Sequence, residues 1–322
     1  MSKTRIFIAG HNGMVGSALV RALQKQDVEL ILKERKELNL LNQKDVQNFF
    51  KYQKIDQVYL AAARVGGIYA NNTYPAEFIY ENLLIQINVI HSAFVNNVKK
   101  LLFLGSSCVY PKNAKQPIKE EYLLNGKLEE TNEAYAVAKI AGIKMCESYN
   151  RQYGKSHNID YRSIMPTNLY GPGDNYHVKN SHVIPSLIYR FHKAKINKLS
   201  SVTIWGTGIP KREFLHVDDM VSAAILIMGI DKKIYYKNKP SVSSCVNVGS
   251  SEDLTIKKLA EIIKEVVGFK GKIYFDPSKP DGVDRKFLNS NLAKKFGFKA
   301  KISLRDGLIK TYQDYIKVEC KL

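Results

Sequence analysis

Near its amino terminus the chain reads Phe7-Ile8-Ala9-Gly10-His11-Asn12-Gly13-Met14-Val15-Gly16. An apolar segment predicts a buried strand over 5–9, and helical periodicity follows over 16–25. The turn between them carries three evenly spaced glycines: Gly10, Gly13 and Gly16. Glycine permits a tight turn and a close backbone approach, while the N–H groups and dipole of a helix N-terminus attract a pyrophosphate. The strand, loop and helix together predict a dinucleotide-binding loop.

Strand-like and helix-like segments continue to alternate beyond this loop. We expect strands over 29–32, 57–62, 100–105 and 160–165, and helices over 45–52, 76–96 and 134–153. This alternation predicts an α/β fold, a doubly wound parallel sheet of the Rossmann type. Beyond residue 173 the pattern becomes irregular, which indicates a second, smaller mixed α/β domain.

The two predicted domains do not divide the chain cleanly. A helix expected over 214–228 is able to pack back onto the sheet, so it is assigned to the first domain. The dinucleotide-binding domain then comprises residues 1–170 and about 213–230, and the substrate-binding domain comprises residues 171–212 and 231–322.

Composition excludes several classes of protein. The chain has 322 residues, of which 45% are hydrophobic and 25% charged, as in globular proteins. It lacks the run of about 18 apolar residues that a membrane span requires, and we expect a cytoplasmic protein with no membrane partner. Its four cysteines are widely spaced, which favours neither a disulfide framework nor a metal site.

The net charge of +19 suits an anionic partner. Lysine and arginine are nevertheless scattered along the chain, and no nucleic-acid-binding motif is present. We therefore expect no nucleic acid partner. A charged nucleotide attracted to a basic surface, or simply a solvated lysine-rich surface, explains the charge.

The residues after the second predicted strand bear on the choice of dinucleotide. An acidic residue there selects NAD, whereas a basic one accepts the 2′-phosphate of NADP. Lys33-Glu34-Arg35-Lys36 occupies this region. Glu34 leaves NAD open, but the three cations favour NADP, with Arg35 as the expected contact. A solvated, charged turn is the alternative for any one of these residues.

Three polar residues suggest a catalytic site. Tyr135 and Lys139 stand four apart in a segment of good helix formers, which places both on one helical face. Tyrosine has a pKa of about 10, and a neighbouring ammonium stabilises its anion. Ser106 follows a predicted strand, at the edge where doubly wound sheets bind ligands, and would orient a carbonyl oxygen. Each residue alone fits a helix surface or a turn, but their joint occurrence indicates catalysis.

Further motifs occur between residues 66 and 219: Gly66-Gly67-Ile68, Asn71-Asn72-Thr73-Tyr74-Pro75, Gly105-Ser106-Ser107-Cys108, Pro166-Thr167-Asn168-Leu169-Tyr170-Gly171-Pro172 and Arg212-Glu213-Phe214-Leu215-His216-Val217-Asp218-Asp219. With Phe7-Ile8-Ala9-Gly10-His11, they resemble the extended short-chain dehydrogenase/reductases and, within them, the GDP-L-fucose synthase family. The resemblance implies NADP(H) as cofactor, a GDP-linked 4-keto sugar as substrate and a homodimer. The implied reaction is reduction at C4 with epimerisation at C3 and C5.

The resemblance also implies roles for individual residues. Tyr135 donates a proton to the C4 oxygen, Lys139 holds the nicotinamide ribose and Ser106 bonds the carbonyl. Cys108 and His182 form the implied epimerisation pair, although by themselves they suggest a buried thiol and a loop histidine. The implied cofactor contacts are Gly10, Asn12, Gly13, Met14, Val15, Gly16, Arg35, Leu104, Gly105, Ser106, Tyr135, Lys139, Pro166, Asn168, Leu169 and His182. The implied substrate contacts are Arg190, Trp205, Arg212, Asp281 and Lys286.

One departure and three alternatives accompany this interpretation. Asn12 stands where the family commonly has an arginine for the 2′-phosphate, so a modest preference for NADP is expected. A 4,6-dehydratase is disfavoured because Ser107-Cys108 replaces its usual Asp-Glu pair. A reductase without epimerase activity, acting on another substrate such as a GDP-4-keto-heptose, stays open. A non-catalytic dinucleotide-binding protein would not need Ser106, Tyr135 and Lys139 together.

Overall fold

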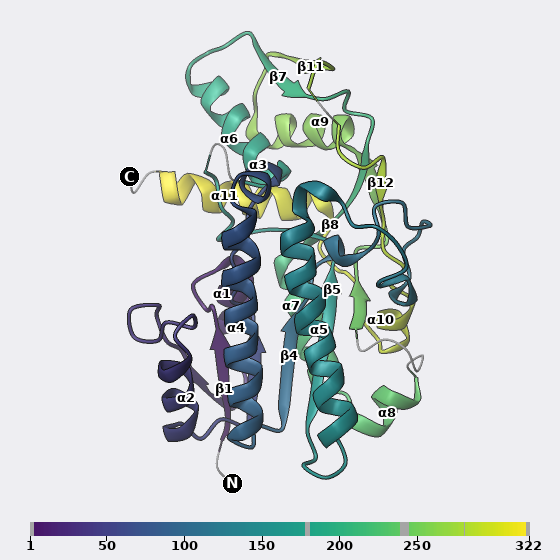
Figure 1. Cartoon of the computed structure of the whole chain (residues 1–322). Helices are drawn as coiled ribbons and strands as arrows, with labels where there is room; N and C mark the ends of the chain where they lie inside the picture. The colour runs from purple at the N-terminus through teal and green to yellow at the C-terminus, as the bar shows by residue number, and fades with distance from the viewer. Residues whose placement is uncertain (1–2, 178–180, 239–244, 280, 320–322) are drawn as a thin grey trace.

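A six-stranded parallel sheet forms the base of the protein in the computed structural model, which describes residues 3–177, 181–238, 245–279 and 281–319 (Figure 1). The strand order is β2-β1-β3-β4-β5-β9, so the order reverses between β1 and β3. A reversal of this kind is the point at which doubly wound sheets bind their ligands. The strands are β1 (Thr4–Ala9), β2 (Val28–Ile31), β3 (Gln57–Leu60), β4 (Lys100–Leu104), β5 (Asp160–Pro166) and β9 (Cys245–Val248).

Helices cover both faces of this sheet, as predicted. Alternate residues of β4 face opposite ways: Leu101 packs in one apolar core and Leu102 in the other. The first core is closed by α2 (Gln43–Tyr52), α4 (Pro75–Val95) and α5 (Glu133–Tyr153). The second is closed by α1 (Met14–Leu23) and α7 (Val217–Gly229). In Figure 1, α4 and α5 run side by side in front of the sheet.

Helix α4 is, within the described residues, the one helix long and apolar enough to cross a membrane. Half of its most apolar window is buried inside the protein. Its buried residues, Val89 and Ile90 among them, pack in the first core. A core helix of a globular protein meets the same criteria, so α4 is explained by the fold.

A smaller part lies above the carboxyl ends of these strands (Figure 1). It contains a four-stranded and a two-stranded sheet around a third apolar core. Its strands are β6 (Asn168–Tyr170), β7 (Ser201–Trp205), β8 (Lys211–His216), β10 (Asp253–Thr255), β11 (Lys272–Asp276) and β12 (Arg285–Lys286). Helices α6 (Val183–Ile196), α9 (Ile256–Val267) and α11 (Leu304–Glu319) pack in this third core. The other α-helices of the molecule are α3 (Ile68–Thr73), α8 (Lys232–Lys237) and α10 (Asn291–Lys295), of which α8 and α10 pack in the second core.

Two details differ from the sequence predictions. The helix expected over 214–228 begins only at Val217, because residues 214–216 pair with β6 as the end of β8. The backbone turns at His216, whose Nδ1 accepts a hydrogen bond from the Asp218 N–H at 3.2 Å and caps α7. In addition, the predicted second domain includes residues 245–248, yet these residues form β9, which pairs with β5 in the large sheet.

Candidate active site

The glycine loop joins β1 to α1 in a tight turn. Gly10 has a φ of +85°, and its carbonyl accepts a hydrogen bond from the Gly13 N–H at 3.1 Å. A Cβ at Gly16 would lie 2.0 Å from the Gly10 oxygen, so packing requires glycine at both ends of the loop. A Cβ at Gly13 would make only an ordinary contact of 3.5 Å. Packing therefore does not explain Gly13, whereas the close approach of a bound ligand would.

The N-terminus of α1 fits a dinucleotide phosphate. Gly13 is the N-cap and offers no side-chain cap, and the first turn contains no acidic residue. The N–H groups of Met14, Val15 and Gly16 have no helical partner because they belong to the first turn. With Asn12 exposed beside them, these donors and the positive end of the helix dipole suit an anion.

The segment after β2 leaves one arginine unpaired. Lys33 contacts Glu37 at 3.1 Å, and Lys36 contacts Glu34 at 3.0 Å. The exposed side chain of Arg35 makes no ion pair with any residue that the structure describes. Arg35 is thus the cation in this turn that remains available for a ligand phosphate.

The carboxyl ends of β4 and β5 bring the next predicted residues together. The Gly105 N–H donates to the Ile164 oxygen at 2.8 Å, and a Cβ at Gly105 would lie 2.2 Å from the Met165 sulfur. Leu104 and Pro166 end these two adjacent strands. The neighbouring strand β6 begins with the other residues expected here: Asn168 and Leu169.

Tyr135 and Lys139 lie on α5 beside the end of β4. The Lys139 ammonium is buried, donates to the Leu104 oxygen at 2.7 Å and lies 5.7 Å from the centre of the Tyr135 ring. Burial lowers the pKa of Lys139 to about 8, although nearby Cys108 opposes the shift. Burial raises the pKa of Tyr135 and nearby Cys108 adds to the rise, so the predicted lowering of this pKa by Lys139 does not occur. The phenol is protonated near neutrality, as a proton donor must be.

Cys108 joins this group from the short turn after β4. Its side chain is 8% exposed, and its N–H donates to the Ser106 Oγ at 3.4 Å. Burial raises the pKa of the Cys108 thiol, and Lys286, Ser106 and Lys139 oppose that rise in this order. Lys286 comes from β12, so this cluster combines residues from both parts of the molecule.

His182 belongs to another element than Tyr135, Lys139 and Cys108. It is the N-cap of α6 and is open to solvent, although desolvation by its surroundings lowers the pKa of the imidazole. Among the described residues, no hydrogen bond or electrostatic contact joins His182 to Cys108. The implied epimerisation pair therefore remains a prediction.

Of the predicted substrate residues, Arg212 and Lys286 lie opposite each other in the pairing of β8 with β12. Burial lowers the pKa of the Arg212 guanidinium, while Asp281 and Asp284 raise it. A Cβ at Gly282 would lie 2.8 Å from Arg212 Nη2, so the chain passes close to this guanidinium. Two cations side by side form a suitable site for a diphosphate.

Of the other predicted substrate residues, Asp281 interacts electrostatically with Arg212. Asp281 accepts hydrogen bonds from the Thr207 N–H at 3.1 Å and the Thr207 Oγ1 at 2.6 Å, which fixes the turn after Trp205. Trp205 is 65% exposed, with the Lys279 ammonium 5.8 Å from its ring centre. Arg190 lies on α6, where burial lowers its pKa.

Sequence reasoning assigned no role to Glu213, which the structure shows as a fully buried carboxylate next to Arg212. In the sequence, Glu213 is marked only by its place directly before the apolar pair Phe214-Leu215, which does not indicate that its side chain is buried.

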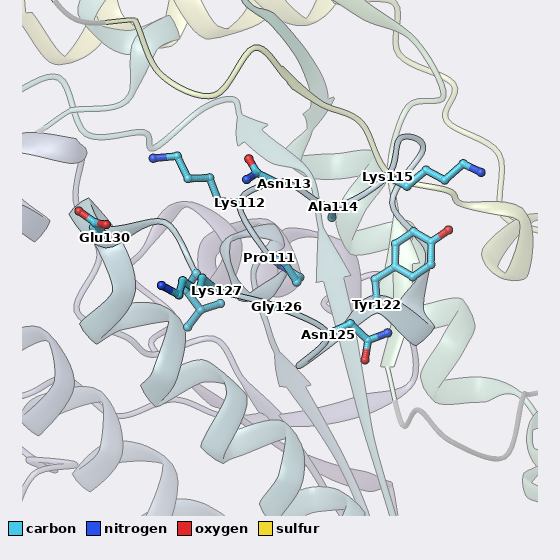
Figure 2. Close-up of a pocket in the computed structure, with 11 residues that line it drawn as sticks. Pro111, Lys112, Asn113, Ala114, Lys115, Tyr122, Asn125, Gly126, Lys127 and Glu130 are labelled. Atoms are coloured by element: carbon cyan, nitrogen blue, oxygen red, sulfur yellow. The ribbon is translucent and has the colours of Figure 1, made fainter.

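A separate pocket of about 620 Å³ lies in the segment between Tyr110 and α5 (Figure 2). Lysines are prominent in its lining, and Lys112 and Lys115 extend in opposite directions from the loop (Figure 2). None of the predicted site residues lines it. It therefore does not represent the catalytic cluster.

Comparison with known proteins agrees with this geometry. A GDP-L-fucose synthase from Escherichia coli (strain K12) is 58% identical over 318 residues, which cover 98% of each chain. A solved GDP-6-OMe-4-keto-L-xylo-heptose reductase from C. jejuni has a TM-score of 0.91 and 41% identity, with 99% of both chains covered. A GDP-D-glycero-L-gluco-heptose synthase from Campylobacter jejuni, solved in the presence of NADPH, has a TM-score of 0.90 and 41% identity, covering 98% of this chain and 99% of that one. Residues 6–235 match the family model described as the NAD dependent epimerase/dehydratase family, and the chain belongs to that family.

Proposed function

We propose that this protein is an NADPH-dependent enzyme that reduces the C4 keto group of a GDP-4-keto-6-deoxy sugar and epimerises C3 and C5, as the name GDP-L-fucose synthase denotes. The observation that carries the proposal is the meeting of Tyr135, Lys139 and Cys108 at the carboxyl end of β4. A proton donor, a cation and a thiol at the same edge of the sheet as the glycine loop support this proposal.

NADPH would be held by the glycine loop, by Arg35 at its 2′-phosphate and by Lys139 at the nicotinamide ribose. When bound, it supplies the hydride for C4. The protonated Tyr135 phenol donates a proton to the C4 oxygen, and Ser106 donates a hydrogen bond to the same oxygen. Arg212 and Lys286 would bind the diphosphate of GDP.

Epimerisation needs proton exchange at the carbons that flank the ketone, because the carbonyl acidifies those C–H bonds and accepts the enolate charge. Inversion removes a proton from one face and returns one to the other, so two groups are required. Cys108 and His182 would serve as this pair. The Lys286 ammonium beside Cys108 favours the thiolate form that proton removal requires.

A reductase that acts on a GDP-4-keto-heptose without epimerisation is the second candidate, supported by the resemblance to the two heptose enzymes. Their identity to this chain is 41%, against 58% for the GDP-L-fucose synthase. The test is incubation with NADPH and a panel of GDP-4-keto sugars, with product stereochemistry determined by NMR. We expect GDP-L-fucose from GDP-4-keto-6-deoxymannose; turnover of the heptose alone would select the second candidate.

The proposal includes a cytoplasmic homodimer. Helices α4 and α5 expose apolar side chains: Tyr80 is 63% exposed, Ile87 43%, Val95 58% and Val137 40%. An apolar surface on two neighbouring helices suits pairing with a second copy. The described cysteines, Cys108, Cys146 and Cys245, are all free, as in a reducing compartment. Light scattering on the purified protein tests the dimer, and a monomeric mass at micromolar concentration would contradict it.

A further inference from the structure

Glu213 is a buried carboxylate with no role in the proposed chemistry. It lies in β8 next to Arg212, and its side chain is 0% exposed. Within the described part of the chain, it forms no ion pair with lysine or arginine. A carboxylate without a cation is costly to bury unless strong hydrogen bonds replace its water. Its hydrogen bonds should therefore indicate why it is retained.

Two backbone N–H groups from distant segments hold the Glu213 carboxylate. The Ser251 N–H donates to Oε1 at 2.8 Å, and the Leu288 N–H donates to Oε2 at 3.1 Å. The loop after β9 follows the carboxylate closely, because a Cβ at Gly249 would lie 2.2 Å from Oε1. Burial raises the pKa of Glu213, and the N–H groups of Leu288 and Ser251 oppose that rise.

The main chain of Glu213 makes a second set of contacts. Its carbonyl accepts hydrogen bonds from the Thr167 Oγ1 at 3.1 Å and the Asn168 Nδ2 at 2.9 Å. These two residues follow β5, on the side where the cofactor is proposed to bind. The main-chain carbonyl of Glu213 thus contacts the cofactor side, while its carboxylate contacts two segments of the substrate side.

The hydrogen bond between Glu213 and the Leu288 N–H lies two residues from Lys286 and so bears on the position of that lysine. Strand β12 is only two residues long and pairs with β8 so that Lys286 lies opposite Arg212. Such a short strand holds few backbone hydrogen bonds of its own, and Glu213 fixes the chain two residues beyond it. Phe287 and Asn289, on either side of Leu288, are bonded to Gln116 and Ile118. The Glu213 contact is the one that joins this segment to β8, the strand of Arg212, so its loss would loosen the spacing between Lys286 and Arg212.

We propose that Glu213 is a positioning residue that holds Arg212 and Lys286 together as the diphosphate-binding pair, by bonding the backbone that follows β12 and β9. This inference rests on the proposed function for the identity of the substrate. It assigns Glu213 no contact with substrate or cofactor, and its action is through Lys286 and Arg212.

The test is the Glu213→Gln variant, which keeps the volume but places an amide N–H₂ against a backbone N–H. Loss of the spacing between Arg212 and Lys286 would weaken one charge-assisted contact to the diphosphate, and such a contact corresponds to a roughly tenfold change in affinity. We expect the KM for the GDP-4-keto sugar and the Kd for GDP to rise by about this factor. The Kd for NADPH should stay within about twofold of wild type, because the Glu213 carboxylate bonds Ser251 and Leu288 and not the glycine loop. The kcat should fall, because Lys286 also favours the Cys108 thiolate.

Glu252→Gln is the matched control. Glu252 lies next to Ser251 in the loop after β9 and is exposed, so its substitution should leave all four values unchanged. If Glu213 has only a structural role, Glu213→Gln should have a lower melting temperature and should bind GDP and NADPH more weakly by the same factor. This result would overturn the proposal. An unchanged Kd for GDP in a folded variant would also overturn it.

If Glu213→Gln does not fold, Glu213→Asp takes its place, because it keeps the charge but is one methylene too short to reach both N–H groups. The same loss of GDP affinity, with NADPH binding intact, is expected. The Kd for GDP requires no turnover, so it separates the two claims. Wild type that binds GDP but reduces no GDP-4-keto sugar contradicts the proposed function alone, whereas wild type that fails to bind GDP contradicts both.

Discussion

The two ends of the proposed site are built in different ways. The cofactor end consists of β1, the glycine loop and the start of α1, with Arg35 a short distance along the chain. The substrate end takes Arg212 from β8 and Lys286 from β12, which meet only because these distant strands pair. A contiguous loop carries its geometry in its own sequence, whereas a site made by long-range pairing depends on the whole fold. Mutations should therefore separate the two ends.

The largest expected effect is at the point where the two ends meet. Tyr135→Phe removes the proton donor but keeps the ring, so reduction of the 4-keto sugar should fall roughly 100-fold or more. NADPH and GDP should bind as they do in wild type, because neither end is altered. Turnover by absorbance at saturating substrate, with both Kd values, checks this. Retention of most of the turnover would remove Tyr135 as the donor.

At the substrate end, Arg212→Ala should raise the KM for the GDP-sugar by about 10- to 100-fold, the scale of a lost charge-assisted hydrogen bond. The effect of this substitution on the Kd for NADPH should be small, since Arg212 lies in β8, opposite Lys286 of β12, and not in the glycine loop. Steady-state kinetics and calorimetry with GDP measure the difference. Equal losses for GDP and NADPH would show that the two ends are not separate.

At the cofactor end, Arg35→Ala should lower the preference for NADPH over NADH by about tenfold, and the preference itself should be modest because Asn12 supplies no second cation. Lys36→Ala is the matched control, because Lys36 is already paired with Glu34. The ratio of kcat/KM for the two coenzymes reports the effect. A ratio unchanged by Arg35→Ala would exclude this guanidinium from the site.

The smallest effect is on the pH profile. The pKa of Lys139 is lowered to about 8, so raising the pH through this value removes the ammonium that is proposed to hold the ribose. We expect kcat/KM to fall on the alkaline side of this pKa. Lys139→Arg, less active but always charged, should lose that alkaline limb. An alkaline limb identical in both proteins would assign the titration to another group.

Much of the cofactor end could be predicted from the sequence, because strand-helix alternation and the glycine spacing are local signals. The helix expected over 214–228 shows where that reasoning fails. Apolar residues such as Phe214 fit a helix or a strand, and pairing with β6 decides for a strand. The role of Glu213 was equally hidden, since its partners at Ser251 and Leu288 are backbone groups of distant segments.

The most direct test of the proposed epimerase and reductase activity is the isotope content of the product formed in D₂O. Wild type acting on GDP-4-keto-6-deoxymannose with NADPH should incorporate deuterium at C3 and C5 and a protium at C4. Cys108→Ser and His182→Asn should reduce that incorporation while C4 reduction of an already epimerised substrate continues. A product reduced at C4 with no deuterium at C3 or C5 would contradict epimerisation and leave Cys108 and His182 without their proposed roles.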